Sequence, residues 1–318
     1  MGYLVRTKTV DVPLLRCDKQ LWSRKAVGRG FRGHPENYYG RVILRKNWVI
    51  DQRGPGAAYD IRTGNPIRTA NPITGKEVDW NFTKSGHHCN YAIASEHLLT
   101  FRAQDAGFCD LASGGTARLV GFRSGCRNSL IPANGVLNAP NFAFGCVCSY
   151  SIFTSLALVH VPDSDMWTYS SKKAGHGPVQ RLGINFGARG DRQAETGTLW
   201  LDYPSVGGSS PIVPVKVVTE EPKWFRLPST QLSGDGLKWV AACGVTGIKS
   251  VVIPLVVGKA KATETLYTVR LYFTEPDEIG PCERVFDVEI QGKKAIQNID
   301  IAKESGGTDL WSGNRGGS

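Results

Sequence analysis

Two turns with the same residue spacing lie close together in the first half of the chain. One is "DIRTG", which runs from Asp60 to Gly64, and the other is "NPITG", which ends at Gly75. In such turns the Asp, Asn or Thr side chain can accept hydrogen bonds from turn amides while the glycine takes the left-handed conformation. Residues 41–51, just before, are rich in β-branched and aromatic side chains, which favour strands. These features together predict short antiparallel strands joined by tight turns.

The same alternation of strand and turn continues further along the chain. Segments 98–116 and 129–163 each repeat a strand, a Gly-containing turn and a second strand. No long stretch has the apolar spacing of an amphipathic helix. Repeated antiparallel units of this size are typical of a radial or solenoid architecture. We therefore predict an all-β fold.

The composition changes after Asp163. Residues 164–178 are polar, with two glycines and a proline, and we interpret them as a linker. In the region that follows, Phe286, Val288 and Ile290 alternate with polar residues. A strand with one buried and one wet face is what a β-sandwich needs. Residues 179–318 are therefore expected to form a second, sandwich-like domain.

The chain carries 38 Lys and Arg against 28 Asp and Glu, a formal net charge of +10. Most of the excess lies between Arg16 and Arg68, and residues 1–40 form a basic, poorly defined N-terminal segment. The "RGFRG" within it suggests RNA binding, but a solvated surface loop is the simpler interpretation, so nucleic acid is not the expected partner. The longest apolar run, 250–258, is far shorter than the ~20 residues of a bilayer span. Neither a membrane span nor a signal peptide is expected.

Eight cysteines raise the question of metal, redox or structural roles. Cys146 and Cys148 are one residue apart, so on a strand they face the same side and pair poorly with each other. A zinc site would need a second cysteine pair at a spacing such as C-x-x-C, and a thioredoxin-like site would need one C-x-x-C; the sequence contains no C-x-x-C. His87, His88 and Cys89 contain metal-ligating atoms but form no complete ligand set. No metal site is predicted.

Two blocks of the sequence resemble known families. "AYDIRTGNP" and "TGKEVDW" resemble the repeat of pyrroloquinoline-quinone-type (PQQ-like) β-propellers, in which a tryptophan, here Trp80, docks one blade onto the next. "INFGARGD", "TLWLDYPSVGG", "VRLYFTEP" and "RVFDVEIQGK" resemble the malectin-like domain that follows such propellers in large bacterial proteins. The resemblance covers residues from about Arg41 to Ile301. The Asp60, Gly64 and Gly75 turns are part of the propeller repeat.

The resemblance also implies that parts of the parent protein are missing. A closed propeller has about four to eight blades, and residues 41–163 supply about three. The sandwich at 179–318 departs from the family near its end, so it is expected to be truncated. The remaining blades of a longer parent protein would then be partners of this chain.

Disulfides and a sugar site are further implications of the resemblance. Related sequences carry cysteines where Cys89, Cys126, Cys146 and Cys148 stand, which suits two bridges and an oxidising, periplasmic or otherwise extracytoplasmic compartment. Malectin grips a glucose disaccharide with aromatic faces, and we predict Trp200, Tyr203 and Trp224 as the aromatic contacts here. The Tyr-Phe pair that contacts sugar in animal malectin is replaced by Pro276 and Asp277. The resemblance therefore favours a changed or lost ligand.

The function expected from these features is that of a non-catalytic extracytoplasmic scaffold with a carbohydrate-binding module. The alternative is a fragment of a PQQ-dependent oxidoreductase, which would bind PQQ and calcium. No other catalytic motif, such as G-x-S-x-G, H-E-x-x-H or a P-loop, is present in the sequence. Outside the alternative, no cofactor is expected.

Overall fold

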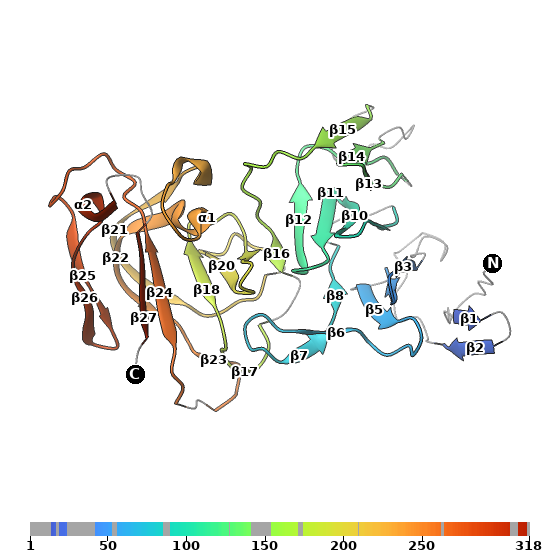
Figure 1. Ribbon diagram of the computed structural model, residues 1–318, viewed down its shortest axis with the longest axis horizontal. Helices are drawn as coiled ribbons and strands as arrows, with labels where there is room; N and C mark the ends of the chain where they lie inside the picture. The colour runs from blue at the N-terminus through green and yellow to red at the C-terminus, as the bar shows by residue number, and fades with distance from the viewer. Residues whose placement is uncertain are drawn as a thin grey trace. The chain divides into compact units, whose positions relative to one another are not determined.

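The fold was analysed in a computed structural model of the 318-residue chain. The structure describes residues 14–16, 19–23, 42–52, 56–84, 90–126, 128–140, 154–170, 174–208, 210–261, 264–305 and 311–316. The chain forms two compact units (Figure 1). Unit 1 comprises residues 1–162, 168–173 and 208–211, and unit 2 comprises 163–167, 174–207 and 212–318. Both are built almost entirely of strands, so the predicted all-β fold is confirmed.

Unit 1 begins with a hairpin and a four-stranded antiparallel sheet. The sheet has the order β3-β4-β5-β8, and the β6–β7 hairpin is inserted before its last strand. The strands are β1 (Leu14–Arg16), β2 (Lys19–Trp22), β3 (Ile43–Arg45), β4 (Trp48–Asp51), β5 (Gly56–Asp60), β6 (Arg68–Ala70), β7 (Glu77–Asp79) and β8 (Asn81–Phe82). The indole N–H of Trp22 on β2 donates to the carbonyl of Ile61 at 3.0 Å. The N-terminal segment thus supplies a hairpin that packs against the first Thr-Gly turn.

Two further antiparallel meanders complete unit 1, with orders β16-β12-β11-β10-β9 and β13-β14-β15. Their strands are β9 (Ile93–Ala94), β10 (Leu98–Ala103), β11 (Asp105–Asp110), β12 (Gly115–Leu119), β13 (Ile131–Ala133), β14 (Val136–Ala139), β15 (Leu156–Val159) and β16 (Tyr169–Ser170). Strand β16 lies in the segment expected to be a linker, yet it pairs with β12. Residues 163–167 and 174–178 of the same segment belong to unit 2.

The Thr-Gly turns have a geometry that their sequence explains. The carboxylate of Asp60 accepts hydrogen bonds from the amides of Arg62 (3.0 Å) and Thr63 (2.8 Å) and from the hydroxyl of Thr63. These bonds lower the pKa of Asp60, with the amide of Thr63 as the largest cause. Gly64 and Gly75 have φ values of 71° and 68°, the left-handed region that suits glycine. Both turns are therefore fixed by a few neighbouring residues.

Aromatic side chains join the first two large sheets of unit 1. Trp80 is only 4% exposed, and its ring lies 5.5 Å from that of Trp48 and 5.8 Å from that of Phe82. Phe82 in turn contacts Phe101 of β10 at 5.7 Å between ring centroids. Tilted and edge-on contacts of this kind are favourable beyond the area they bury. Trp80 thus belongs to a hydrophobic cluster that also contains Phe101 of the neighbouring sheet, and its role in docking one blade onto another stays a prediction.

Unit 2 is made of small sheets of two or three strands. The pairs are β17 with β23, β21 with β22, β24 with β27 and β25 with β26, and a three-stranded sheet has the order β18-β20-β19. The strands are β17 (Gly177–Pro178), β18 (Gly183–Phe186), β19 (Arg192–Gln193), β20 (Leu199–Tyr203), β21 (Lys216–Arg226), β22 (Cys243–Val252), β23 (Val256–Val257), β24 (Thr268–Phe273), β25 (Val285–Ile290), β26 (Lys293–Asp300) and β27 (Trp311–Gly316). Short helices η2 (Ser229–Gln231), α1 (Lys238–Ala241) and α2 (Ile301–Ser305) accompany them.

One strand of unit 2 has the burial pattern that its alternating sequence predicts, but one strand pairing was not predicted. Along β25, Phe286, Val288 and Ile290 are partly buried while the residues between them are exposed. Strands β18 and β20, however, pair in parallel, which the sequence did not predict. No helix in the described part of the chain has the length and apolar character needed to cross a membrane.

Candidate functional site

Trp200 lies in the interior of unit 2. The residue is 9% exposed, and its ring meets those of Trp239 and Tyr272 edge-on, with centroids 6.1 and 5.5 Å away. A Cβ atom on Gly183, its partner on β18, would lie 2.2 Å from Cδ2 of the indole. Glycine at position 183 is therefore what lets the ring lie flat on the sheet. Trp200 is a packing residue in this structure and has little surface to offer a ligand.

Tyr203 lies on the opposite face of the same strand. Successive side chains of a strand point to opposite faces, so a spacing of three separates Tyr203 from Trp200. The ring of Tyr203 meets that of Phe186 edge-on, with centroids 5.6 Å apart. The carbonyl of Tyr203 accepts a hydrogen bond of 2.7 Å from the amide of Gly187. The spacing was a signal in the sequence that Trp200 and Tyr203 do not act together.

Trp224 reaches the same strand end as Tyr203. It is 45% exposed on β21, and its Cε3 atom would lie 3.5 Å from a Cβ atom on Gly187. Gly187 has a φ of 76° and is buried. Of the three predicted aromatic contacts, Tyr203 and Trp224 both approach Gly187, Tyr203 through its backbone carbonyl and Trp224 through its ring. The ring that packs on Tyr203 is that of Phe186, which sequence reasoning missed.

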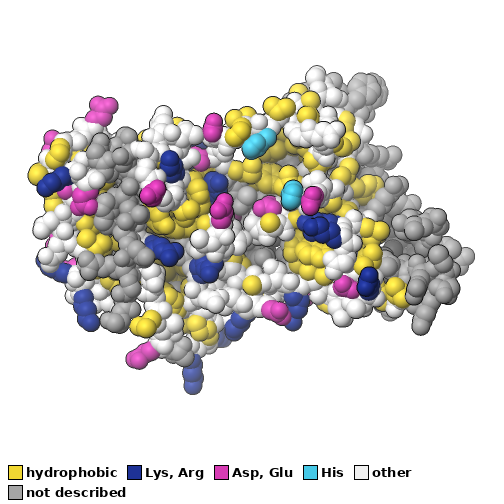
Figure 2. All heavy atoms as spheres, viewed as in Figure 1, with side chains coloured by type: hydrophobic (Ala, Val, Ile, Leu, Met, Phe, Trp, Pro, Cys, Tyr) yellow, Lys and Arg dark blue, Asp and Glu magenta, His cyan; other side chains and the backbone are white. Residues whose placement is uncertain are grey.

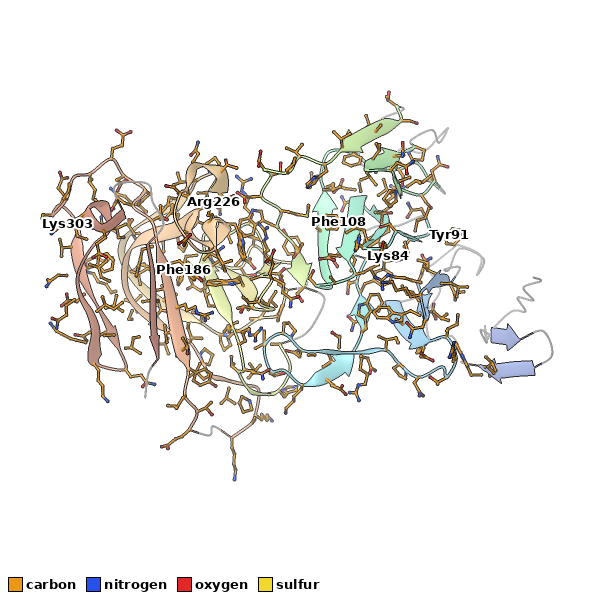
Figure 3. The ribbon with its side chains drawn as sticks, in the orientation of Figure 1. Lys84, Tyr91, Phe108, Phe186, Arg226 and Lys303 are labelled. Carbon is orange, nitrogen blue, oxygen red and sulfur yellow. The ribbon has the colours of Figure 1, made fainter. Side chains whose placement is uncertain are left out.

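Two polar contacts hold this strand end in place. The guanidinium of Arg226 donates to the carbonyl of Gly187, and Arg226 lies two residues after Trp224, on the same face of β21. Figure 3 labels Phe186 on β18 and Arg226 of the neighbouring sheet. The buried carboxylate of Asp202 accepts a 2.6 Å hydrogen bond from the amide of Val206, which anchors the loop after β20. We call Phe186, Tyr203, Trp224 and Arg226 the aromatic strand end.

The loop that contacts sugar in animal malectin has a different chemistry here. Glu275 is 2% exposed and pairs with Arg284, whose Nη2 donates to Asp277 at 2.8 Å. The hydrogen bond from Arg284 lowers the pKa of Asp277, and the same bond raises the pKa of Arg284. Glu275, Asp277 and Arg284 therefore bind one another. Asp277 occupies a position of the Tyr-Phe pair that contacts sugar in animal malectin, so no aromatic face for stacking is present at that position.

Three of the four cysteines predicted to form disulfides lie outside the described residues. Cys89, Cys146 and Cys148 lie there, together with His87 and His88, so the disulfides stay a prediction. Cys126 is described, and its Sγ accepts a hydrogen bond from Nη1 of Arg102 at 3.5 Å. Among the described residues, no three His, Cys, Asp or Glu side chains gather as a metal site would require.

Charge is dispersed on the visible surface. On the face drawn in Figure 2, the described Lys and Arg side chains lie singly or in small groups among acidic and hydrophobic ones. Any electrostatic selectivity of this face therefore depends on local groups of residues and not on one broad basic surface.

Comparison with known families finds one match, which lies in unit 2. Residues 260–312 match the Malectin domain family, a range that contains β24, β25 and β26. No PQQ-like repeat family is detected for the first unit. No curated protein and no solved structure matches the chain significantly. Part of unit 2 is thus similar to the Malectin domain family.

Proposed function

We propose that unit 2 binds a glycan through the aromatic strand end and that the chain is a non-catalytic scaffold of an extracytoplasmic protein. The observation that carries the proposal is the 45% exposure of Trp224, whose ring lies against Gly187 at the end of β18. The C–H face of a sugar ring packs well on an aromatic face because the π-system is negative where the C–H hydrogens are positive. The backbone contacts of Gly187 hold the strand end in place, which reduces the entropy lost on binding.

Unit 1 is proposed to be a scaffold of PQQ-like blades. Its antiparallel meanders and the central position of Trp80 are the features that support this. Addition of PQQ and calcium is then expected to give no bound-quinone spectrum and no oxidation of alcohols or sugars. Stoichiometric quinone binding would favour the oxidoreductase alternative.

Oligosaccharide titration of the full chain tests the glycan proposal. Cello- and malto-oligosaccharides serve as neutral probes in isothermal titration calorimetry. Trp224→Ala is expected to weaken binding by about tenfold, the usual effect of truncating an anchoring tryptophan, while Trp224→Phe keeps part of the affinity. Leu266→Ala, at an exposed apolar position of unit 2, is the matched control and should leave binding unchanged. Equal affinity of Trp224→Ala and the parent chain would contradict the proposal.

A further inference from the structure

Arg192 on β19 contacts a cluster of tryptophan rings in unit 2, formed by Trp167, Trp200 and Trp239. Its guanidinium carbon lies 4.7 Å from the ring centroid of Trp239. The ring of Trp239 is itself held edge-on by Trp167 and Trp200, at 6.0 and 6.1 Å between centroids. A guanidinium stacked on a ring keeps its N–H donors in its own plane, directed away from the ring. The position of the cation is thus set by packing and leaves donors for an acceptor in that plane.

The charge of Arg192 is only loosely paired. The nearest carboxylate, that of Asp165, lies 3.9 Å from Nη1. That carboxylate accepts hydrogen bonds from the hydroxyl (2.6 Å) and the amide (3.1 Å) of Ser229. Within the described part of the chain, the Arg192 guanidinium has this ion pair and the ring contact but no hydrogen-bond acceptor. Burial lowers the pKa of Arg192, and Asp165 opposes the effect.

Other positive charges lie near the same place. Arg226 and Arg189, both exposed, act electrostatically on the thiol of Cys243, as does Asp165. Burial raises the pKa of that thiol to about 11, so it stays neutral and adds no negative charge. The side chain of Arg192 is 34% exposed, which leaves it accessible to a ligand from solvent. The thiol of Cys243 thus lies within electrostatic range of two arginines and of Asp165.

We propose that Arg192 binds an anionic group, a carboxylate or a sulfate, of an acidic glycan. The inference rests on the carbohydrate-binding function proposed above and names the class of glycan. A planar guanidinium fork forms two parallel hydrogen bonds with such a group, and these charge-assisted bonds are about twice as strong as neutral ones. The half-buried Trp167 and Trp239 beside it offer apolar surface for the sugar ring. Neutral sugars would gain the stacking but not the paired hydrogen bonds.

The experiment compares three oligosaccharides of equal length on the full chain by calorimetry: a galacturonate, a sulfated and a neutral one. The chain should bind at least one anionic oligosaccharide about tenfold more tightly than the neutral one at low salt, with the preference reduced at high salt. Arg192→Gln should remove the preference and leave neutral binding within about twofold. Arg192→Lys keeps the charge but not the fork, so it should keep only part of the preference. Lys303→Gln removes one exposed positive charge on α2 and should change nothing.

The outcomes separate the two proposals. Preference for the galacturonate alone or for the sulfated sugar alone identifies the anion, and equal preference for both still supports an anion site at Arg192. Neutral binding equal to both anionic ones would overturn the inference and leave the glycan function standing. An anionic preference that survives undiminished in Arg192→Gln would place the site elsewhere and overturn the inference. Binding of none of the three would overturn both proposals.

Discussion

Lys84 follows β8 in unit 1 and carries an ammonium group that folding removes from water. Figure 3 labels it, and its Nζ lies 6.0 Å from the ring centroid of Phe82. Burial lowers its pKa from the usual 10.5 to about 8, and the nearby Asp51 only partly opposes this. The difference corresponds to about 3 kcal/mol of unfavourable interaction for the charged form. The charged lysine thus destabilises the folded state near neutral pH.

Lys84→Met keeps the apolar stem and removes this charge. Because the contact with Phe82 is lost as well, we expect a net stabilisation of about 1–3 kcal/mol near neutral pH. The unfolded state binds the proton more tightly than the folded state, so the parent chain gains stability as the pH rises from about 8 to 10.5. The advantage of the variant should therefore shrink over that range and vanish above it.

Urea denaturation followed by tryptophan fluorescence at several pH values measures both effects. Lys76→Met, at an exposed position of the same unit, is the control and should show no such dependence. A destabilised Lys84→Met variant at neutral pH, or an advantage that stays constant between about pH 8 and 10.5, would refute the assignment of a desolvated charge.

Three further predictions concern the packing of Trp200, the ion pair of Glu275 and the pairing of the cysteines. Gly183→Ala should cost about 1–3 kcal/mol of stability in thermal denaturation, and less in a Trp200→Phe background; an equal cost in both would contradict the close contact. Glu275→Ala should destabilise by about 2 kcal/mol because it removes a buried, charge-assisted hydrogen bond while Arg284 keeps its pair with Asp277. Glu220→Ala, which breaks an exposed pair, should do far less, and equal effects would be evidence against burial of the first pair. Peptide mapping without reduction should link the four cysteines expected to pair, Cys89, Cys126, Cys146 and Cys148; free thiols at these positions in exported protein would contradict it.

Features that depend on neighbouring residues could be predicted from the sequence. The Asp60 turn is closed by bonds to residues two and three positions away, so its residue types suffice to indicate it. The alternation of Phe286, Val288 and Ile290 indicates a strand with one buried face, because it needs only the period of the strand.

Features that depend on residues far apart in the sequence could not be predicted from the sequence. The parallel pairing of β18 with β20 brings Gly183 beneath Trp200, and nothing local in either segment marks that contact. Likewise Arg192 meets Trp239 only because the strand and helix that carry them pack together, so a lone arginine in the sequence gave no indication of a site. The exposure that distinguishes Trp224 from Trp200 also follows from tertiary packing and not from residue type.

The most direct test of the central proposal is the response of the tryptophan indole N–H signals to a glycan. The eight tryptophans can be resolved by nitrogen-15 labelling and assigned with single Trp→Phe variants. On titration with the tightest-binding oligosaccharide, the Trp224 signal should shift progressively while that of the buried Trp200 stays nearly fixed. Saturable binding that leaves the Trp224 signal unmoved would show that the aromatic strand end is not the glycan site.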